Sequence, residues 1–151
     1  MHRKLEEEGW MSLREIWYAT TAIAMGGHTS FASMSEGPLT VPLSVPVEMG
    51  GDGGPGTNPE QLFALGFASS FLAAMTAISL RRAIALSDEV SVVAEVGVGP
   101  AERGLGFKVC LHVSLPGLEK PVAEALIRTA QSFCPYSNGT RLNVDVDVVL
   151  A

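Results

Sequence analysis

The sequence predicts an α+β fold with elements in the order βββ-α-ββ-α-β, formed as a single domain by residues 13–151. Two observations lead to this prediction: runs of alternating apolar residues that indicate strands, and two segments with helical spacing that interrupt them. A third is the order itself, which lacks the regular βα alternation of a doubly wound sheet. A length of 151 residues suits one domain, and 47% hydrophobic residues suffice for a core. Residues 1–12 are expected to be an N-terminal extension.

Three strands are expected before the first helix. Residues 13–25 and 28–34 are interpreted as two strands around a Gly-Gly turn, although the alternation in the first is ambiguous. In residues 39–46, "LTVPLSVP", the apolar side chains share one face, and Pro42 and Pro46 fall on the other. Proline has no amide hydrogen to donate to a neighbouring strand, so this run is predicted to be an edge strand.

The first helix is expected to begin at Pro59, within a glycine-rich stretch. Asn58 is a suitable N-cap, proline is favoured at the first helical position, and Gln61 at the third position matches a capping box. Residues 62–80, "LFALGFASSFLAAMTAISL", carry no charge and are long enough to cross a membrane. The serines and glycine within this run, and the capping signals at its start, instead favour a buried helix. A helix that is apolar on every side needs cover on every side, so we expect a homodimer that buries paired helices.

The second half is predicted to contain a hairpin, a helix and a closing strand. Residues 92–98 and 105–115 alternate around the turn "GPAERG". A helix is expected to start at Pro121, with apolar residues at helical spacing: Val122, Leu126, Ile127, Ala130 and Phe133. Residues 142–150, "LNVDVDVVL", alternate strictly and form the predicted last strand.

Charge and composition exclude several classes of partner. The net charge of −6 and a pI near 5.0 argue against nucleic acid, which requires a basic face, and against an acidic membrane surface. Small neutral or apolar ligands remain open. The N-terminal stretch "MHRKLEEEGW" lacks the apolar segment of a secretion signal, so a cytoplasmic protein is expected. Two cysteines, without a CxxC or clustered Cys/His spacing, predict neither a disulfide scaffold nor a metal or other cofactor.

The two cysteines have different predicted surroundings. Cys110 falls on the polar face of the hairpin with Lys108 and His112, where the simplest interpretation is a small side chain on a strand. Cys134 precedes Pro135, so it is a candidate cap of a short helix, whose dipole would favour a reactive thiol. The alternative for Cys134 is buried packing, and the local sequence alone does not separate the two.

Two longer motifs resemble a known family. The stretches "GGDGGPGTNPEQLFALGF" and "CPYSNGTR", at residues 50–67 and 134–141, closely resemble organic hydroperoxide resistance proteins of the OsmC-like family, and the similarity extends over residues 13–151. The resemblance implies an intertwined α+β homodimer with two central helices. It also implies a peroxidatic cysteine on the first helix, which reduces organic hydroperoxides and then forms a disulfide with a resolving cysteine. An arginine and a glutamate would activate the peroxidatic thiol, and lipoyl-type dithiols would regenerate the protein.

Carried over position by position, the resemblance implies that two of the four chemical groups are retained. Glu60, in "NPEQLF", matches the family glutamate, and Cys134 matches the resolving cysteine. Ser70 stands in the peroxidatic position and His28 in the arginine position. A serine hydroxyl cannot form a sulfenic acid, so we expect peroxidase activity to be lost or weak. The two replacements together favour natural divergence over a single engineered Cys→Ser change.

Three functions follow as hypotheses. The first is organic hydroperoxide resistance with little activity, through Cys134 or Cys110. The second is non-catalytic binding or sensing of a small apolar organic molecule. The third is a hydrolase, because His28, Glu60 and Ser70 are the residue types of a hydrolase triad. Against the third, no nucleophile elbow surrounds Ser70, and a serine within a helix can bond to a carbonyl one turn earlier.

Overall fold

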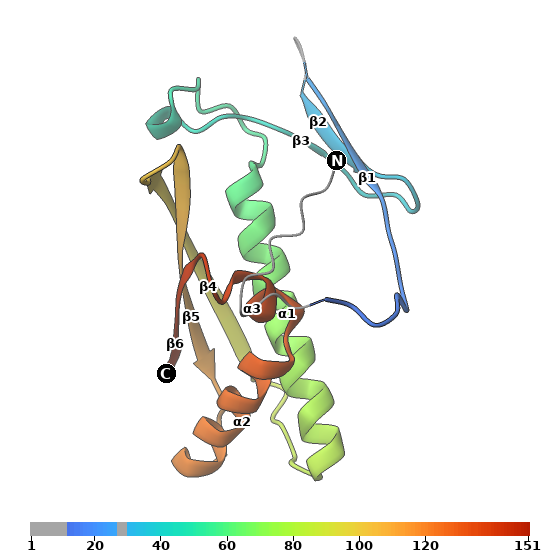
Figure 1. Cartoon of the computed structure of the whole chain (residues 1–151), viewed down its shortest axis with the longest axis vertical. Coiled ribbons are helices and arrows are strands. Elements are labelled where there is room, and N and C mark those ends of the chain that lie inside the picture. The colour runs from blue at the N-terminus through green and yellow to red at the C-terminus, as the bar shows by residue number, and fades with distance from the viewer. Residues whose placement is uncertain (1–11, 27–29) are drawn as a thin grey trace. The chain divides into compact units, whose positions relative to one another are not determined.

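The computed structural model describes residues 12–26 and 30–151 (Figure 1). These residues form two compact units, residues 12–62 and residues 63–151, and each unit is described by itself below. His28 and nearly all of the predicted N-terminal extension lie outside the described residues. The assignment of one domain after that extension stays a prediction.

The first unit contains a three-stranded antiparallel sheet in the order β1-β2-β3. Its strands are β1 (Ala22–Met25), β2 (Phe31–Met34) and β3 (Thr40–Pro42). The three predicted strands are confirmed, but the first and third are shorter than predicted. β2 pairs with only four residues of β1, so residues 13–21 stay outside this sheet. β3 lies at the sheet edge, as its proline predicts.

The first long helix, α1 (Pro59–Arg82), begins at the predicted cap. A short 3-10 helix, η1 (Val47–Met49), lies in the stretch before it. The Gln61 amide donates a hydrogen bond of 2.8 Å to Asn58 Oδ1, which confirms Asn58 as the N-cap. The predicted capping box is wrong in one detail. In a capping box the Gln61 side chain would accept from the backbone amide of Asn58, but here Gln61 Oε1 accepts a 2.8 Å hydrogen bond from the hydroxyl of Thr57, which precedes the N-cap.

The second unit, from Phe63 onward, holds a second sheet and further helices. Its elements after α1 are β4 (Ser91–Pro100), β5 (Leu105–Ser114), α2 (Lys120–Phe133), α3 (Pro135–Thr140) and β6 (Asp145–Leu150). The sheet order is β4-β5-β6, with β5 antiparallel to β4 and parallel to β6. The predicted hairpin and closing strand are confirmed, and so is the α+β class.

The core of the second unit lies between α1, α2 and one face of its sheet (Figure 1). Its central buried residues come from three elements: Phe67, Phe71, Ala74, Met75 and Ile78 of α1, Val109, Leu111 and Val113 of β5, and Ala123, Leu126, Ile127 and Ala130 of α2. Val122 and Phe133, predicted for the same face of α2, are instead 40% and 45% exposed. The apolar stripe begins at Ala123, and the same spacing continues to Cys134, which is fully buried.

The opposite face of α1 is apolar but exposed in the single chain. Leu65 and Leu80 are 69% and 78% exposed. Between them, the hydroxyls of Ser69 and Thr76 donate to backbone carbonyls one turn earlier on the helix. By length and composition, α1 alone among the helices of the described residues could cross a membrane, a property that core helices of globular proteins share. In the single chain, the predicted burial of this helix is therefore confirmed for one face only.

We expect Asn58→Ala to lower the free energy of unfolding by about 1 kcal/mol, because the cap bond to the Gln61 amide is lost. Urea unfolding followed by circular dichroism would measure this change as a lower midpoint. Asn143→Ala is the matched control, since Asn143 is exposed and its side chain makes no hydrogen bond within the described residues. Equal midpoints for the two variants would contradict the assigned cap.

Candidate functional site

Two residues predicted for the site, Ser70 and Cys134, lie in contact. Ser70 Oγ on α1 is 3.4 Å from Cys134 Sγ, although 64 positions separate them in sequence. Either group serves as donor at this distance. The neighbouring Ser69 donates to the Leu65 carbonyl at 2.7 Å, whereas the hydrogen-bond partner of Ser70 within the described residues is the thiol. A serine within a helix can bond back to a carbonyl one turn earlier, but the side chain of Ser70 instead faces the α2–α3 corner and contacts the thiol.

Cys134 occupies that corner because a proline follows it. Its amide donates to the Ala130 carbonyl at 2.8 Å, so it ends α2, and its carbonyl accepts from the Asn138 amide at 3.0 Å, so it begins α3. Between these bonds its backbone is extended, with φ −66° and ψ 125°, as expected for a residue before Pro135. The predicted start of a short helix is confirmed. The thiol makes no cap bond, however, and its full burial matches the packing alternative.

Four aromatic rings, Phe63, Phe67, Phe107 and Tyr136, form what is called here the aromatic cluster. The ring centroids of Phe67 and Tyr136 are 5.5 Å apart. Phe67 lies on α1, as Ser70 does, and Tyr136 lies on α3, which begins directly after Cys134. Phe63 lies 5.9 Å from Phe67 and stacks on Phe107 of β5 at 5.1 Å. A Cβ at Gly66 would lie 2.5 Å from the Tyr136 oxygen, so glycine permits α3 to approach α1. The aromatic cluster therefore gives Ser70 and Cys134 apolar, polarizable surroundings.

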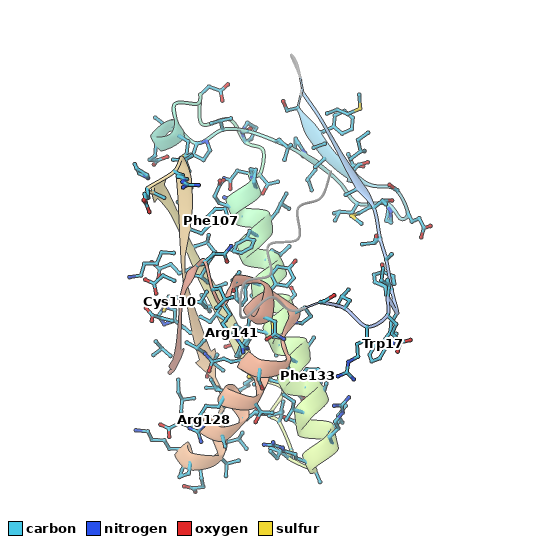
Figure 2. The ribbon with its side chains drawn as sticks, in the orientation of Figure 1. Trp17, Phe107, Cys110, Arg128, Phe133 and Arg141 are labelled. Carbon is cyan, nitrogen blue, oxygen red and sulfur yellow. The ribbon has the colours of Figure 1, made fainter. Side chains whose placement is uncertain are left out.

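Cys110 lies on the other side of the sheet. Val109 and Leu111 on either side of it are fully buried, so the alternation of β5 turns Cys110 away from the core that holds Cys134. Figure 2 shows Cys110 on the side of the sheet away from the helices. His112, on the same face, lies 3.6 Å from Glu95. Both cysteines are free thiols, and the sheet separates them.

Glu60, the next predicted site residue, belongs to the first unit, whereas Ser70 and Cys134 belong to the second. Glu60 is partly buried in the first turn of α1, where the helix dipole favours a carboxylate. His28 falls outside the described residues.

Comparison with known proteins identifies the family. Residues 50–149 match the family model described as OsmC-like protein. The chain belongs to the OsmC-like family. It is 47% identical over 137 residues to an uncharacterized protein of Acinetobacter baylyi, covering 91% of this chain and 95% of that protein. It is 43% identical over 140 residues to an organic hydroperoxide resistance protein of Xanthomonas axonopodis pv. citri, covering 93% and 99%.

Solved structures agree with this assignment. A crystal structure of an organic hydroperoxide resistance protein from Legionella pneumophila superimposes with a TM-score of 0.84 at 39% identity, covering 91% of this chain and 99% of that one. The predicted family and fold are thereby confirmed. In this OsmC-like protein, the described residues contain no group of three His, Cys, Asp or Glu side chains that could hold a metal ion.

The aromatic cluster of this OsmC-like protein was missed by the sequence reasoning. Phe63 and Phe67 are four residues apart on the predicted helix, which is a detectable signal for a shared face. From the sequence, Phe107 was assigned only to a strand, and Tyr136 only to the "CPYSN" motif. Their contacts with the helix arise from tertiary packing, for which the local pattern carries no signal.

We expect Ser70→Cys to form a disulfide with Cys134 after treatment with an organic hydroperoxide. The new sulfur would start near the 3.4 Å contact distance of the present oxygen, and a modest side-chain adjustment would close the bond of about 2.05 Å. Non-reducing peptide mapping would locate the bond. Ser69→Cys is the matched control, since Ser69 is exposed and turned toward its own helix backbone. A bond to Cys134 in the control, or none in Ser70→Cys, would contradict this geometry.

Proposed function

We propose that this protein is a divergent organic hydroperoxide resistance protein that has kept the fold and the resolving thiol but reduces organic hydroperoxides poorly or not at all. The observation that carries the proposal is the 3.4 Å contact between Ser70 and Cys134. The family resemblance implies a cysteine pair at these two positions. A contact between the two positions supports that alignment, under which an alcohol stands where the attacking thiol would be.

The chemical reason lies in the electron balance of peroxide reduction. A thiolate attacks one peroxide oxygen, the O–O bond breaks, and the products are an alcohol and a sulfenic acid. The second thiol then displaces water to form a disulfide, which a dithiol of the lipoyl type would reduce. Ser70 cannot take the first step, because a hydroxyl has no corresponding oxidation states. Cys134 is fully buried, and Cys110 is turned away from Cys134 by the sheet, so neither thiol replaces the missing pair.

A second candidate function, binding or sensing of a small apolar organic molecule, is supported by the aromatic cluster. Phe63, Phe67, Phe107 and Tyr136 pack together next to the Ser70 and Cys134 segments, and aromatic rings bind apolar ligands without any redox step. The hydrolase hypothesis lacks such support, because the hydroxyl of Ser70 contacts a thiol and no base within the described residues. Turnover of a short-chain aryl ester that disappears in Ser70→Ala would restore that hypothesis.

The exposed face of α1 supports assembly as a homodimer. This face, defined by Leu65, Ser69, Ala73, Thr76 and Leu80, is exposed in the single chain. The hydroxyls on it are already bonded to backbone carbonyls, so covering it would leave no polar group without a partner. A second copy offers the same apolar face to cover it. We also propose that the dimer acts in the cytoplasm, without a metal or other cofactor.

Light scattering is expected to give a dimer at micromolar concentration. Leu65→Glu should weaken the dimer by at least about tenfold, because it buries a charge at the apolar interface. Leu142→Glu is the matched control, since Leu142 is 71% exposed and Leu65 is 69% exposed, and it should leave the dimer intact. A wild-type protein that is a stable folded monomer under these conditions would refute the assembly.

We expect the wild-type protein to reduce cumene hydroperoxide poorly or not at all with dihydrolipoamide as reductant. Ser70→Cys alone should help little, because His28 stands where the family resemblance implies an arginine, and histidine is largely neutral near pH 7. The Ser70→Cys/His28→Arg double variant should exceed the product of the two single effects by about tenfold, since groups that act as one unit are not additive. Steady-state rates of the four proteins would measure this coupling.

Two results would overturn the proposed loss of activity. Fast reduction by the wild-type protein that is abolished in Cys134→Ser would show that this thiol carries the reaction alone. Fast reduction abolished instead in Cys110→Ser would assign it to the sheet cysteine. A double variant that folds as a dimer but gains no activity would show that the surrounding site has diverged as well, and it would favour the binder.

A further inference from the structure

A separate pocket lies between α2, α3 and β6 in the second unit. It has a volume of about 380 Å³, within the range of about 300–1,000 Å³ that is typical of small-molecule sites. Arg128 on α2 and Arg141 just after α3, both labelled in Figure 2, line it together with three hydroxyl-bearing residues. Val144 and Val146 form an apolar part of its wall. None of these residues belongs to the Ser70–Cys134 pair.

The two arginines are the first sign of what this pocket binds. The chain has a net charge of −6, yet within the described residues no carboxylate lies at ion-pair distance from Arg128 or Arg141. No ion pair within the described residues involves an arginine, and what distinguishes Arg128 and Arg141 is that both line one pocket. Two guanidinium groups without a carboxylate partner at one pocket give it a local positive potential, which attracts an anion.

Arg141 is held in place while most of its donors stay available. One terminal nitrogen, Nη2, donates to the Gln131 carbonyl at 3.1 Å and to Asn138 Oδ1 at 2.7 Å. These bonds fix the plane of the guanidinium group against the end of α2. A guanidinium has five N–H donors, and the three on Nε and Nη1 have no partner within the described residues. A fixed fork of free donors is the geometry that recognises phosphate and carboxylate groups.

Ser137 provides an independent sign. Its Oγ is buried and has no hydrogen-bond partner within the described part of the chain, and the residue lines the same pocket. Leaving a buried hydroxyl without a partner costs about 1–3 kcal/mol. The Thr140 hydroxyl in the same wall already donates to the Tyr136 carbonyl at 2.7 Å. Ser137 therefore keeps an unused donor beside the pocket, and rotation about its Cα–Cβ bond would turn this donor toward a ligand oxygen.

We propose that this pocket binds a small organic oxyanion, a carboxylate or phosphate monoester with an apolar portion. Arg128, Arg141 and Ser137 bind the charged oxygens, and Val144 and Val146 contact the apolar portion. The volume leaves room beyond an inorganic ion, and the apolar wall at Val144 and Val146 favours a ligand with an organic portion. The site is independent of the proposed function, because it uses neither Ser70 nor Cys134.

Isothermal titration calorimetry of the full-length protein with three probes tests the proposal. Phenyl phosphate and benzoate carry the two anions on the same ring, and benzyl alcohol is the neutral analogue. We expect at least one anion to bind at least about tenfold more tightly than benzyl alcohol, since charge-assisted hydrogen bonds are about twice as strong as neutral ones. The tighter of the two anions identifies the phosphate or the carboxylate as the recognised group.

Variants separate a built site from a general charge effect. Arg128→Gln should weaken anion binding by about tenfold without harming the fold, because Arg128 is exposed and makes no hydrogen bond or ion pair within the described residues. Ser137→Ala should weaken it several-fold. Arg103→Gln, in the exposed turn between β4 and β5, removes the same charge elsewhere and should have no effect. Absence of anion binding, equal affinity for benzyl alcohol, or equal losses in Arg128→Gln and Arg103→Gln would each overturn the proposal.

Discussion

Burial of one face of α1 against β5 and α2 is the constraint on which the second unit depends. Phe67, Phe71 and Met75 are fully buried on that face, and each such side chain contributes about 1.5–3 kcal/mol by leaving water. Once this face is committed to the core, the rotation of the helix about its axis is set. Ser70, next to Phe71 in sequence, then faces the corner between α2 and α3, and its contact with Cys134 follows from the packing.

Under the proposed loss of activity, the Ser70–Cys134 contact shows how a fold can persist without the peroxide chemistry of the family that it resembles. A hydroxyl is compact enough to fill the space beside the thiol and polar enough to share a hydrogen bond with it, so packing is preserved. Peroxide reduction, in contrast, depends on a polarizable thiolate that can be oxidised and then resolved by a second thiol. Packing energetics and redox chemistry therefore respond very differently to the exchange of one sulfur for one oxygen.

Net charge and local charge give different information about partners. A total of −6 argues against polyanions such as nucleic acid, because their binding depends on many basic contacts over a large face. Arg128 and Arg141 nonetheless line one pocket, and two guanidinium groups are enough to recognise a single small anion. The bonds that hold Arg141 also tie α3 to the end of α2, so the same residue stabilises the corner that contains Cys134.

Local features of this protein were determined by the sequence itself. The Asn58 cap, the edge position of the proline-containing strand and the alternation of β5 depend on neighbouring residues, so they were readable from spacing and residue type. The resemblance likewise supplied the family, and it supplied as predictions the match of Cys134 to the resolving cysteine and the replacement at position 70. Tertiary structure decided the rest: the 3.4 Å contact across 64 positions, the aromatic cluster, the unburied face of α1 and the pocket between Arg128 and Arg141. Each of these depends on how separate elements pack, because side chains distant in sequence meet only when hydrophobic burial fixes the rotation and spacing of the helices that carry them.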